Sequence, residues 1–294
     1  MLPKDVHVLF QKDVIDLIEK YEKPLGAIEE IRARLNQPLE CMYKRGYQLL
    51  PYEMHQHVFK ELLDNLFVSS RYRYARELKE CFITLPGGHR VGLAGDIIMN
   101  NQGIDHLEII TSLNIRIHQL QRISFNISHR QLFVDSQYAS TLIIGPPNAG
   151  KTSLLRMLVQ SISQDVSPFS KKICVIDERK EIMPPLLSKP NACARVDHLS
   201  GCPKHLAIPL MIRSMSPDII IVDEIATNHD VTALLDGMKA GISLICTAHA
   251  SSYQDLASRM FFKVLLSERL FDRVIVLSST KKGELQLINL KESV

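Results

Sequence analysis

Eight residues near the middle of the chain have the types and spacing of a phosphate-binding loop. They follow the pattern G-x-x-x-x-G-K-T from Gly145 to Thr152. Glycine lets successive N–H groups converge on one anion, and the N-terminus of a following helix adds a positive dipole end. Lys151 would contact the β- and γ-phosphates of a nucleotide, and the Thr152 hydroxyl would ligate Mg²⁺. We predict nucleotide contacts at Gly145, Pro146, Pro147, Asn148, Ala149, Gly150, Lys151, Thr152 and Ser153.

Two carboxylates follow a separate apolar run at residues 218–222. Asp223 would hold Mg²⁺ through water, and Glu224 could orient or deprotonate an attacking water. An apolar run that ends in Asp-Glu is a weak indication alone, because many strands end in polar turns. Downstream of a phosphate loop, the pattern favours hydrolysis over binding alone.

Two further apolar runs also end in polar groups. Residues 172–177 lead into Glu178 and Arg179, and residues 243–247 lead into His249. His249 could donate a hydrogen bond to the γ-phosphate or respond to its loss. The sequence favours that role no more than it favours a turn histidine without one.

Strands and helices must bring these groups together. The apolar, β-branched run at 140–144 predicts a buried strand, and residues 153–159 have helical spacing. The runs at 172–177, 218–223 and 243–247 predict three more strands with helical connections. Because parallel strands end at the same edge of a sheet, the charged groups should converge where a nucleotide would lie.

The first 120 residues have a different pattern. It predicts helices at 13–20 and 57–67, a glycine hairpin at 82–95 and a strand at 112–117, whereas 28–35 fits either strand or helix. A helix near 121–134 would join this part to the rest, and the proline-rich residues 183–190 would form a loop. The basic, aromatic run at 71–76 could bind single-stranded nucleic acid, although a solvated helix face with buried tyrosines is favoured.

Composition narrows the class of protein. The chain has 294 residues, of which 46% are hydrophobic and 23% charged, so it can build a sizeable core. The net charge of +3 creates no global field that would recruit nucleic acid. The sequence contains no apolar run of the roughly 18 residues needed to cross a bilayer, and its first residues lack the pattern of a signal peptide. We expect a cytoplasmic protein without direct membrane insertion.

The chain resembles the stage III sporulation protein AA family, ATPases of spore-forming Firmicutes related to type II and type IV secretion ATPases. The resemblance runs nearly end to end, and the glycine hairpin at 83–95 and the Arg-Ser-Met-Ser-Pro-Asp run at 213–218 are its most specific parts. Asn148 and Ala149 replace a Gly-plus-small pair, and Ala226 stands where glycine is common. Neither departure removes a phosphate ligand. The remaining segments that carry the resemblance are 29–35, 112–117, 145–152, 175–179, 222–225 and 247–249.

The resemblance implies a homo-oligomer, a hexameric ring, at the mother-cell face of a membrane channel that leads into the forespore. It implies an acidic box in which Glu178 shares catalytic duty with Glu224, and a histidine box that contains His249. Arg213 would serve the nucleotide or a subunit contact. The sequence leaves open which carboxylate is the main catalytic one, and which arginine of a neighbouring subunit completes the site.

We therefore expect an α/β, RecA-like P-loop ATPase core with a mainly parallel sheet at 121–294, preceded by a smaller α+β domain at 1–120. It would hydrolyse ATP with Mg²⁺, held by Thr152 and Asp223, to energise the channel. Two alternatives are a nucleic-acid-stimulated ATPase that uses the run at 71–76 and a nucleotide-regulated scaffold with negligible turnover. Glu224 beside Asp223 disfavours the scaffold. The expected catalytic residues are Glu224, Glu178, His249 and Arg213.

Overall fold

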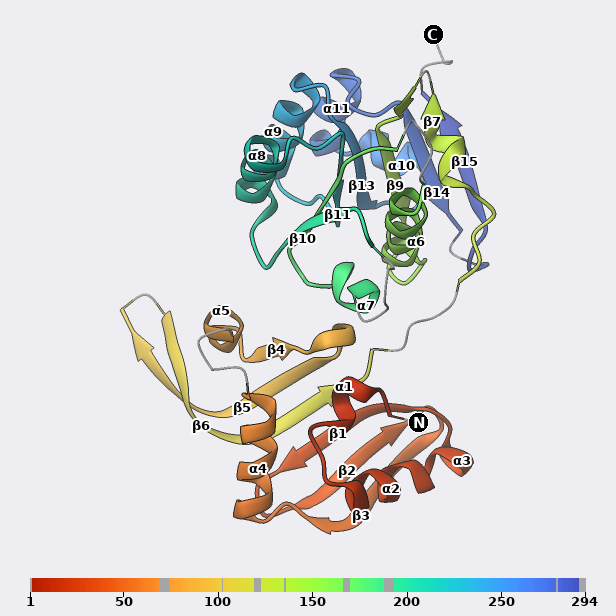
Figure 1. Ribbon diagram of the computed structural model, residues 1–294. Helices are drawn as coiled ribbons and strands as arrows, with labels where there is room; N and C mark the ends of the chain where they lie inside the picture. The colour runs from red at the N-terminus through yellow and green to blue at the C-terminus, as the bar shows by residue number, and fades with distance from the viewer. Residues whose placement is uncertain are drawn as a thin grey trace. The chain divides into compact units, whose positions relative to one another are not determined.

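The structure is a computed structural model, and its chain divides into two compact units. Unit 1 is Met1–Leu120 and unit 2 is Gln121–Val294 (Figure 1). The described residues are 2–68, 74–101, 103–118, 123–134, 136–165, 170–187, 193–278 and 280–290.

An antiparallel sheet forms the centre of unit 1. In the described residues it has six strands in the order β3-β2-β1-β6-β5-β4. Ile31 and Ala33 of β1 are fully buried because they face a core shared with Ile18 and Leu62 of the helices. The ambiguous segment 28–35 is thus a strand. The elements are α1 (Lys4–His7), α2 (Lys12–Lys20), α3 (Glu22–Leu25), β1 (Ile28–Arg34), β2 (Pro38–Tyr43), β3 (Gly46–Glu53), α4 (Gln56–Leu66), α5 (Ala75–Lys79), β4 (Phe82–Thr84), a 3₁₀ turn (Pro86–Gly88), β5 (Arg90–Asn100) and β6 (Gly103–Arg116).

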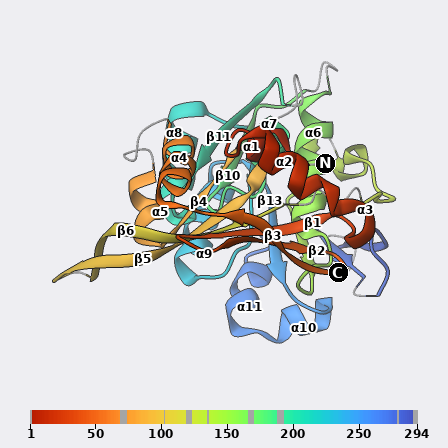
Figure 2. The ribbon, with the colours of Figure 1, turned by 90° about the horizontal axis from the view of Figure 1, so that it is seen from below.

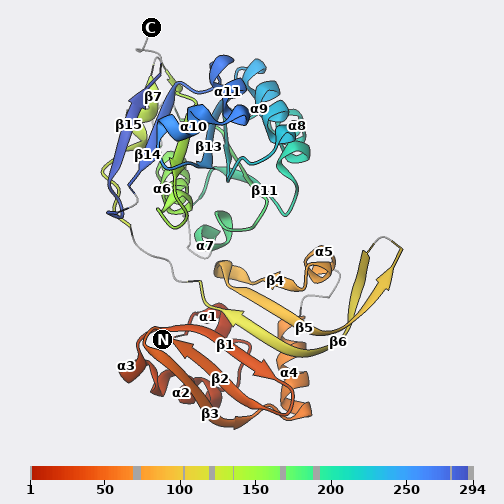
Figure 3. The same cartoon turned by 180° about the vertical axis from the view of Figure 1, so that it is seen from behind.

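Strands β5 and β6 continue beyond the rest of this sheet. β4 pairs with β5 only at Arg90–Gly92, and β1 pairs with β6 only at Ser112–Arg116. From residue 94 to residue 110 the two strands therefore pair only with each other, as far as the described residues show, whereas the Thr111 carbonyl oxygen still accepts from the Leu35 N–H. Figures 2 and 3 show this ribbon leaving the sheet. The sequence pattern predicted strands near 82–95 and 112–117 but missed the long extension between them.

A mainly parallel sheet forms the centre of unit 2. Its described strands are seven, in the order β11-β10-β12-β13-β9-β14-β15, and only the β14–β15 pair is antiparallel. Strands β9, β10 and β12 are buried at every position, as expected for parallel strands that are covered on both faces. The strands are β9 (Thr141–Gly145), β10 (Ile173–Asp177), β11 (Val196–Ser200), β12 (Ile219–Val222), β13 (Ser243–His249), β14 (Arg273–Leu277) and β15 (Leu285–Asn289), with β7 (Phe133–Val134) and β8 (Gln137–Tyr138) in a separate pair.

Helices cover both faces of this parallel sheet. The core on one face includes Leu154 of α6 and Met183 of α7, and the core on the other includes Ile208 of α8 and Leu234 of α9. Unit 2 is therefore a three-layer α/β structure. The helices are α6 (Lys151–Ser163), α7 (Met183–Leu187), α8 (Lys204–Met215), α9 (Asn228–Lys239), α10 (Tyr253–Ser258) and α11 (Met260–Ser267).

Most of the expected elements are confirmed, and two expectations are wrong. The predicted helix at 121–134 is instead an irregular segment, a 3₁₀ turn at His129–Leu132 and strand β7 in its described part. Its apolar residues Ile123, Phe125 and Ile127 alternate with a period of two, which does not suit a helix. Residues 183–187 form helix α7 rather than a loop, since proline is tolerated in a first turn.

Two further sequence expectations can be compared with the structure. Residues 71–73 of the basic, aromatic run lie outside the described residues, whereas Tyr74 is buried. Among the described residues, every helix is too short or too polar to span a bilayer.

Candidate nucleotide-binding site

The phosphate loop connects the end of β9 to the start of α6. Gly150 has a φ of 102° and forms the N-cap of α6, and Asn148 also has a positive φ of 62°. A residue with a Cβ is strained at the first angle, whereas asparagine tolerates the second. No described side chain caps α6, so the N–H groups of its first turn face the loop as potential anion donors.

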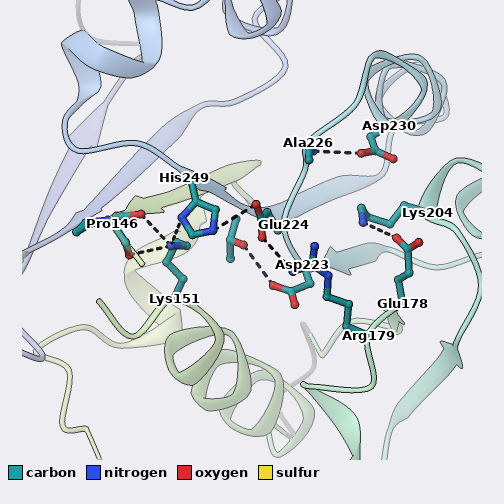
Figure 4. Close-up of polar contacts among 12 residues, drawn as sticks. Pro146, Lys151, Glu178, Arg179, Lys204, Asp223, Glu224, Ala226, Asp230 and His249 are labelled. Carbon is teal, nitrogen blue, oxygen red and sulfur yellow. Dashed lines mark hydrogen bonds and ion pairs between the residues drawn. The ribbon is translucent and has the colours of Figure 1, made fainter. Parts of the chain in front are cut away.

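Lys151 closes this loop through its ammonium group. Its Nζ donates hydrogen bonds to the carbonyl oxygens of Gly145 at 2.8 Å and Pro146 at 3.0 Å, and it lies 3.1 Å from His249 Nδ1 (Figure 4). Burial lowers the pKa of Lys151, and the carboxylates of Glu224 and Asp223 oppose that shift. Lys151 is thus held at the position where phosphates would replace the carbonyl oxygens.

His249 links this lysine to the acidic pair. An ammonium can only donate, so Nδ1 of His249 accepts from Lys151 and Nε2 carries the hydrogen. That Nε2 lies 3.3 Å from Oε1 of Glu224. The register of β13 against β9 explains why His249 lies beside Lys151, because His249 is paired with Gly145 at the start of the phosphate loop.

Glu224 also has a cationic neighbour. Nη1 of Arg179 lies 3.4 Å from its Oε2, and the Glu224 side chain is 24% exposed. A chain of polar contacts therefore runs from Lys151 through His249 and Glu224 to Arg179 (Figure 4). Four segments that are distant in the sequence supply these residues.

Asp223 is the most buried carboxylate of the acidic pair. It is 7% exposed, and Oγ1 of Thr247 donates to its Oδ1 at 3.4 Å. Burial raises the pKa of Asp223, and the nearby Asp177 and Glu224 carboxylates add to that rise, whereas a backbone N–H bond from Glu224 and the Arg179 cation oppose it. A cation beside this group would relieve the cost of its buried charge.

Two of the expected catalytic residues do not join this cluster. Glu178 forms a 2.5 Å ion pair with Lys204 at the start of α8. Arg213 is exposed in the last turn of α8, where its Nε donates to the Pro209 carbonyl oxygen at 3.2 Å. The structure therefore separates Glu178 and Arg213 from Lys151, His249 and Glu224.

The sequence analysis missed two polar residues of the cluster. Arg179 follows the first acidic pair and was read only as part of a charged strand end. Thr247 lies inside the buried strand β13, where a threonine gives no sign of a polar role. Thr152 and Ser153 are half-buried in the first turn of α6, beside Lys151.

The residues present fit a nucleotide with Mg²⁺. The first turn of α6 offers N–H groups to phosphate oxygens, and the Lys151 ammonium is already turned toward acceptors. The Thr152 hydroxyl and the Asp223 carboxylate are oxygen donors of the kind that Mg²⁺ prefers. Burial raises the pKa of Asp223, and a bound cation would favour its charged form.

Comparisons with known proteins show the family and the fold. The family described as sporulation stage III, protein AA, matches residues 4–292. The stage III sporulation protein AA of Bacillus subtilis (strain 168) is 40% identical over 257 residues, which is 86% of this chain and 83% of that relative.

Solved structures resemble the chain in fold. The pilus retraction motor PilT with bound ADP matches with a TM-score of 0.61 at 13% identity, over 92% of this chain and 82% of that one. The ATPase DotB of Legionella pneumophila matches with a TM-score of 0.54 at 12% identity, over 98% and 81%. The chain therefore shares the fold of PilT and DotB, a RecA-like P-loop α/β core with an N-terminal domain. With the family match over nearly its whole length, the chain belongs to the stage III sporulation protein AA family.

Proposed function

We propose that this protein binds and hydrolyses ATP with Mg²⁺ and uses the energy to drive subunit motion in a membrane-bound sporulation complex. One observation carries the proposal: Lys151 of the phosphate loop, His249 and Glu224 are joined by direct polar contacts at the edge where the parallel strands end. The bound ADP of the PilT neighbour supports an adenine nucleotide as the ligand.

The phosphate loop would bind the polyphosphate. Lys151 would exchange the Gly145 and Pro146 carbonyl oxygens for β- and γ-phosphate oxygens, and the N–H groups of α6 would donate to the same anion. Thr152 and Asp223 would hold Mg²⁺, which neutralises phosphate charge when bound. Asp223 favours this role because its carboxylate is buried with a raised pKa, and a cation beside it would relieve the cost of its buried charge.

Glu224 would act on the attacking water. Its carboxylate accepts from His249 and pairs with Arg179, so both of its oxygens are oriented before substrate arrives. When Lys151 turns to phosphate, its contact with His249 would lengthen. His249 could then contact the γ-phosphate while it stays next to Glu224, so its position would depend on whether that phosphate is present. Glu178 is the weaker candidate for the base because Lys204 already holds its carboxylate.

The assembly part of the proposal follows from the family and the fold. Membership of a sporulation family supports a role for this protein during spore formation. The fold shared with PilT and DotB supports a hexameric ring docked on a membrane protein. We propose that the ring acts in the mother-cell cytoplasm, peripheral to the membrane. Arg213, exposed on α8, suits a subunit contact better than a nucleotide contact within its own chain.

Nucleotide binding and phosphate release test the enzymatic part. We expect calorimetry to detect Mg-ATP binding to the wild type and a loss of about tenfold to a hundredfold in affinity for Lys151→Ala, which removes a charged hydrogen-bond donor. Phosphate release should require Mg²⁺. Wild-type protein that binds no nucleotide, or hydrolysis that survives Lys151→Ala, would contradict the proposal.

Light scattering of Glu224→Gln with and without Mg-ATP tests the assembly. The substitution should retain ATP while blocking hydrolysis, so a ring would accumulate at a mass near six chains. A chain that binds ATP but keeps its monomer mass would mean that a membrane partner builds the ring or that the motor proposal is wrong. Addition of single-stranded nucleic acid decides the alternative, which requires salt-sensitive stimulation of hydrolysis.

A further inference from the structure

The ribbon formed by residues 94–111 of β5 and β6, here called the arm, exposes large apolar side chains. Ile97 is 44% exposed, Ile98 37%, Met99 60% and Ile109 51%. Such side chains occur singly on most protein surfaces, but a group on one protruding element marks an interaction surface. The nucleotide site of unit 2 uses none of these residues.

The arm has built-in bends. A Cβ placed on Gly95 would collide with the carbonyl oxygen of Ile109, so only glycine allows the two strands to approach here. The pairing shifts register at three points between Ala94 and Met99. Bulges of this kind bend and twist a ribbon. The base of the arm is anchored in unit 1, because Leu107 is 7% exposed in its core and Ile110 packs against that core. Beyond this base a two-stranded ribbon is marginally stable in water, so a surface that receives its exposed residues would add stability.

The charge of the arm restricts the surface that can receive it. Its residues include Asp96, Asp105 and Glu108 but no lysine or arginine, so the arm carries a charge of −3. Because the whole chain is +3, the remainder carries +6. Anionic lipid and nucleic acid repel an acidic arm, whereas a protein surface that is both apolar and basic attracts it. The remainder of this chain has the net positive charge that such a partner needs.

Helix α8 of unit 2 presents a surface of this kind. Leu206 is 53% exposed and Leu210 48%, and the exposed Arg213 follows on the same side of the helix at a spacing of four and three residues. The opposite side of α8, with Ala207, is buried against the sheet. Among the described residues, no carboxylate forms an ion pair with Arg213.

We propose that the arm of one copy docks on the outer face of α8 of a second copy, with its isoleucines against Leu206 and Leu210 and its carboxylates toward Arg213. The two surfaces differ, so the contact is head-to-tail and can be repeated around a closed ring. The inference deepens the assembly part of the proposed function and rests on it.

Photo-cross-linking tests the docking partner directly. Ile98 is replaced by p-benzoylphenylalanine in unlabelled chain, which is mixed with excess ¹⁵N-labelled wild-type chain and Mg-ATP before illumination. We expect cross-linked peptides from 204–215 of α8, in ¹⁵N-labelled form. Cross-links to unlabelled α8 alone would mean that the arm folds onto its own chain, and cross-links to any other segment would assign a different surface. Either result overturns the proposal.

Solution mass with matched variants gives a second readout. In the Glu224→Gln background with Mg-ATP, Ile98→Glu should weaken self-association at least tenfold. Leu49→Glu is the control, since Leu49 is 50% exposed on β3 of the same unit. Circular dichroism verifies that both variants fold. Equal mass for the two variants, or a background protein that stays monomeric while it binds ATP, overturns the inference.

ATP affinity, measured on the same samples, separates this inference from the proposed function. The arm lies outside the nucleotide site, so Ile98→Glu should bind ATP as the background protein does. If the background protein binds no ATP, the proposed function fails. If it binds ATP and the arm substitution leaves assembly intact, only the docking inference fails.

Discussion

Two neighbouring strands of unit 2 each lead into an Asp-Glu dipeptide, and the two dipeptides have different contacts. β10 ends at Asp177, followed by Glu178, and β12 is followed by Asp223 and Glu224. The strands are paired in parallel, with Ile176 opposite Val222, so the two Asp-Glu pairs lie at the same edge of the sheet. Their local sequences are nearly interchangeable.

The first pair is engaged in holding the fold. Asp177 is fully buried and accepts N–H hydrogen bonds from Glu181 at 2.8 Å, Ile182 at 3.0 Å and Met183 at 2.8 Å, which fixes the start of α7. Glu178 is paired with Lys204. Both carboxylates thus have strong partners that a ligand would have to displace.

The second pair is left available for chemistry. Asp223 has a long contact with Thr247 and a raised pKa, and Glu224 lies between His249 and Arg179. The difference teaches that saturated hydrogen bonding and a close ion pair, rather than burial, make one acidic pair structural: Asp177 and Asp223 are both buried, and the Glu178 and Glu224 side chains are 29% and 24% exposed. Weaker, convergent contacts beside the phosphate loop leave the other pair suited to the catalytic role that we propose.

The largest effect should separate the two glutamates. Glu224→Gln should lower kcat by about 10²–10⁴, the range of a general base, and leave ATP affinity nearly unchanged. Glu178→Gln should lower kcat by less than about tenfold and destabilise the fold by about 1–3 kcal/mol, because Lys204 loses its charged partner. Single-turnover phosphate release and urea unfolding measure the two quantities. Equal losses of kcat would show that both glutamates take part in catalysis.

The next effect should separate the two aspartates through stability. Asp177→Asn should lower the free energy of unfolding by about 1–3 kcal/mol, because an amide has one acceptor oxygen and would turn an N–H donor toward backbone donors. Asp223→Asn should not destabilise the nucleotide-free protein. Denaturant unfolding of both variants at neutral pH measures the two free energies of unfolding. Similar losses of stability for the two variants would contradict the distinction between a structural and an available aspartate.

The pH dependence of Asp223→Asn sharpens the same contrast. The pKa of Asp223 is raised in the folded protein, so the folded state binds its proton more tightly and stability falls as pH rises from the ordinary aspartate pKa toward the raised one. The variant should therefore be more stable than wild type at neutral pH. The advantage should fade on acidification below about pH 4, where aspartate is protonated in both states. An advantage that stays constant with pH would contradict this explanation.

The smallest effect should come from Arg179. Its side chain is 58% exposed, and an exposed ion pair contributes about 0.2–1 kcal/mol, so Arg179→Ala should lower kcat by no more than about fivefold. ATP affinity should not change. Because Arg179 also opposes the rise of the Asp223 pKa, the acidic limb of the pH–rate profile should move to higher pH. Arg179→Lys should restore part of the kcat and part of the pH shift. If Arg179→Ala leaves the acidic limb of the pH–rate profile unshifted, Arg179 does not influence the site.

Local sequence determined much of the fold of this protein. The phosphate loop between a β-branched run and a helical run predicted β9 and α6, because neighbouring residues set backbone preference and burial period. The apolar runs predicted β10, β12 and β13 for the same reason. The period of two in Ile123, Phe125 and Ile127 was present in the sequence as well, yet a helix was predicted there.

The tertiary structure alone decided which residues meet. Nothing near Glu178 or Glu224 in the sequence distinguishes them; the distinction comes from Lys204 and His249, which packing and strand register bring from other elements. The contact of Lys151 with His249 depends on the pairing of β9 with β13. The arm was missed because the sequence pattern ended the hairpin at residue 95 and predicted the next strand only at 112–117, and the pairing of the residues between them depends on the tertiary structure. A residue's type limits what chemistry it can do, and its long-range neighbours decide whether it does it.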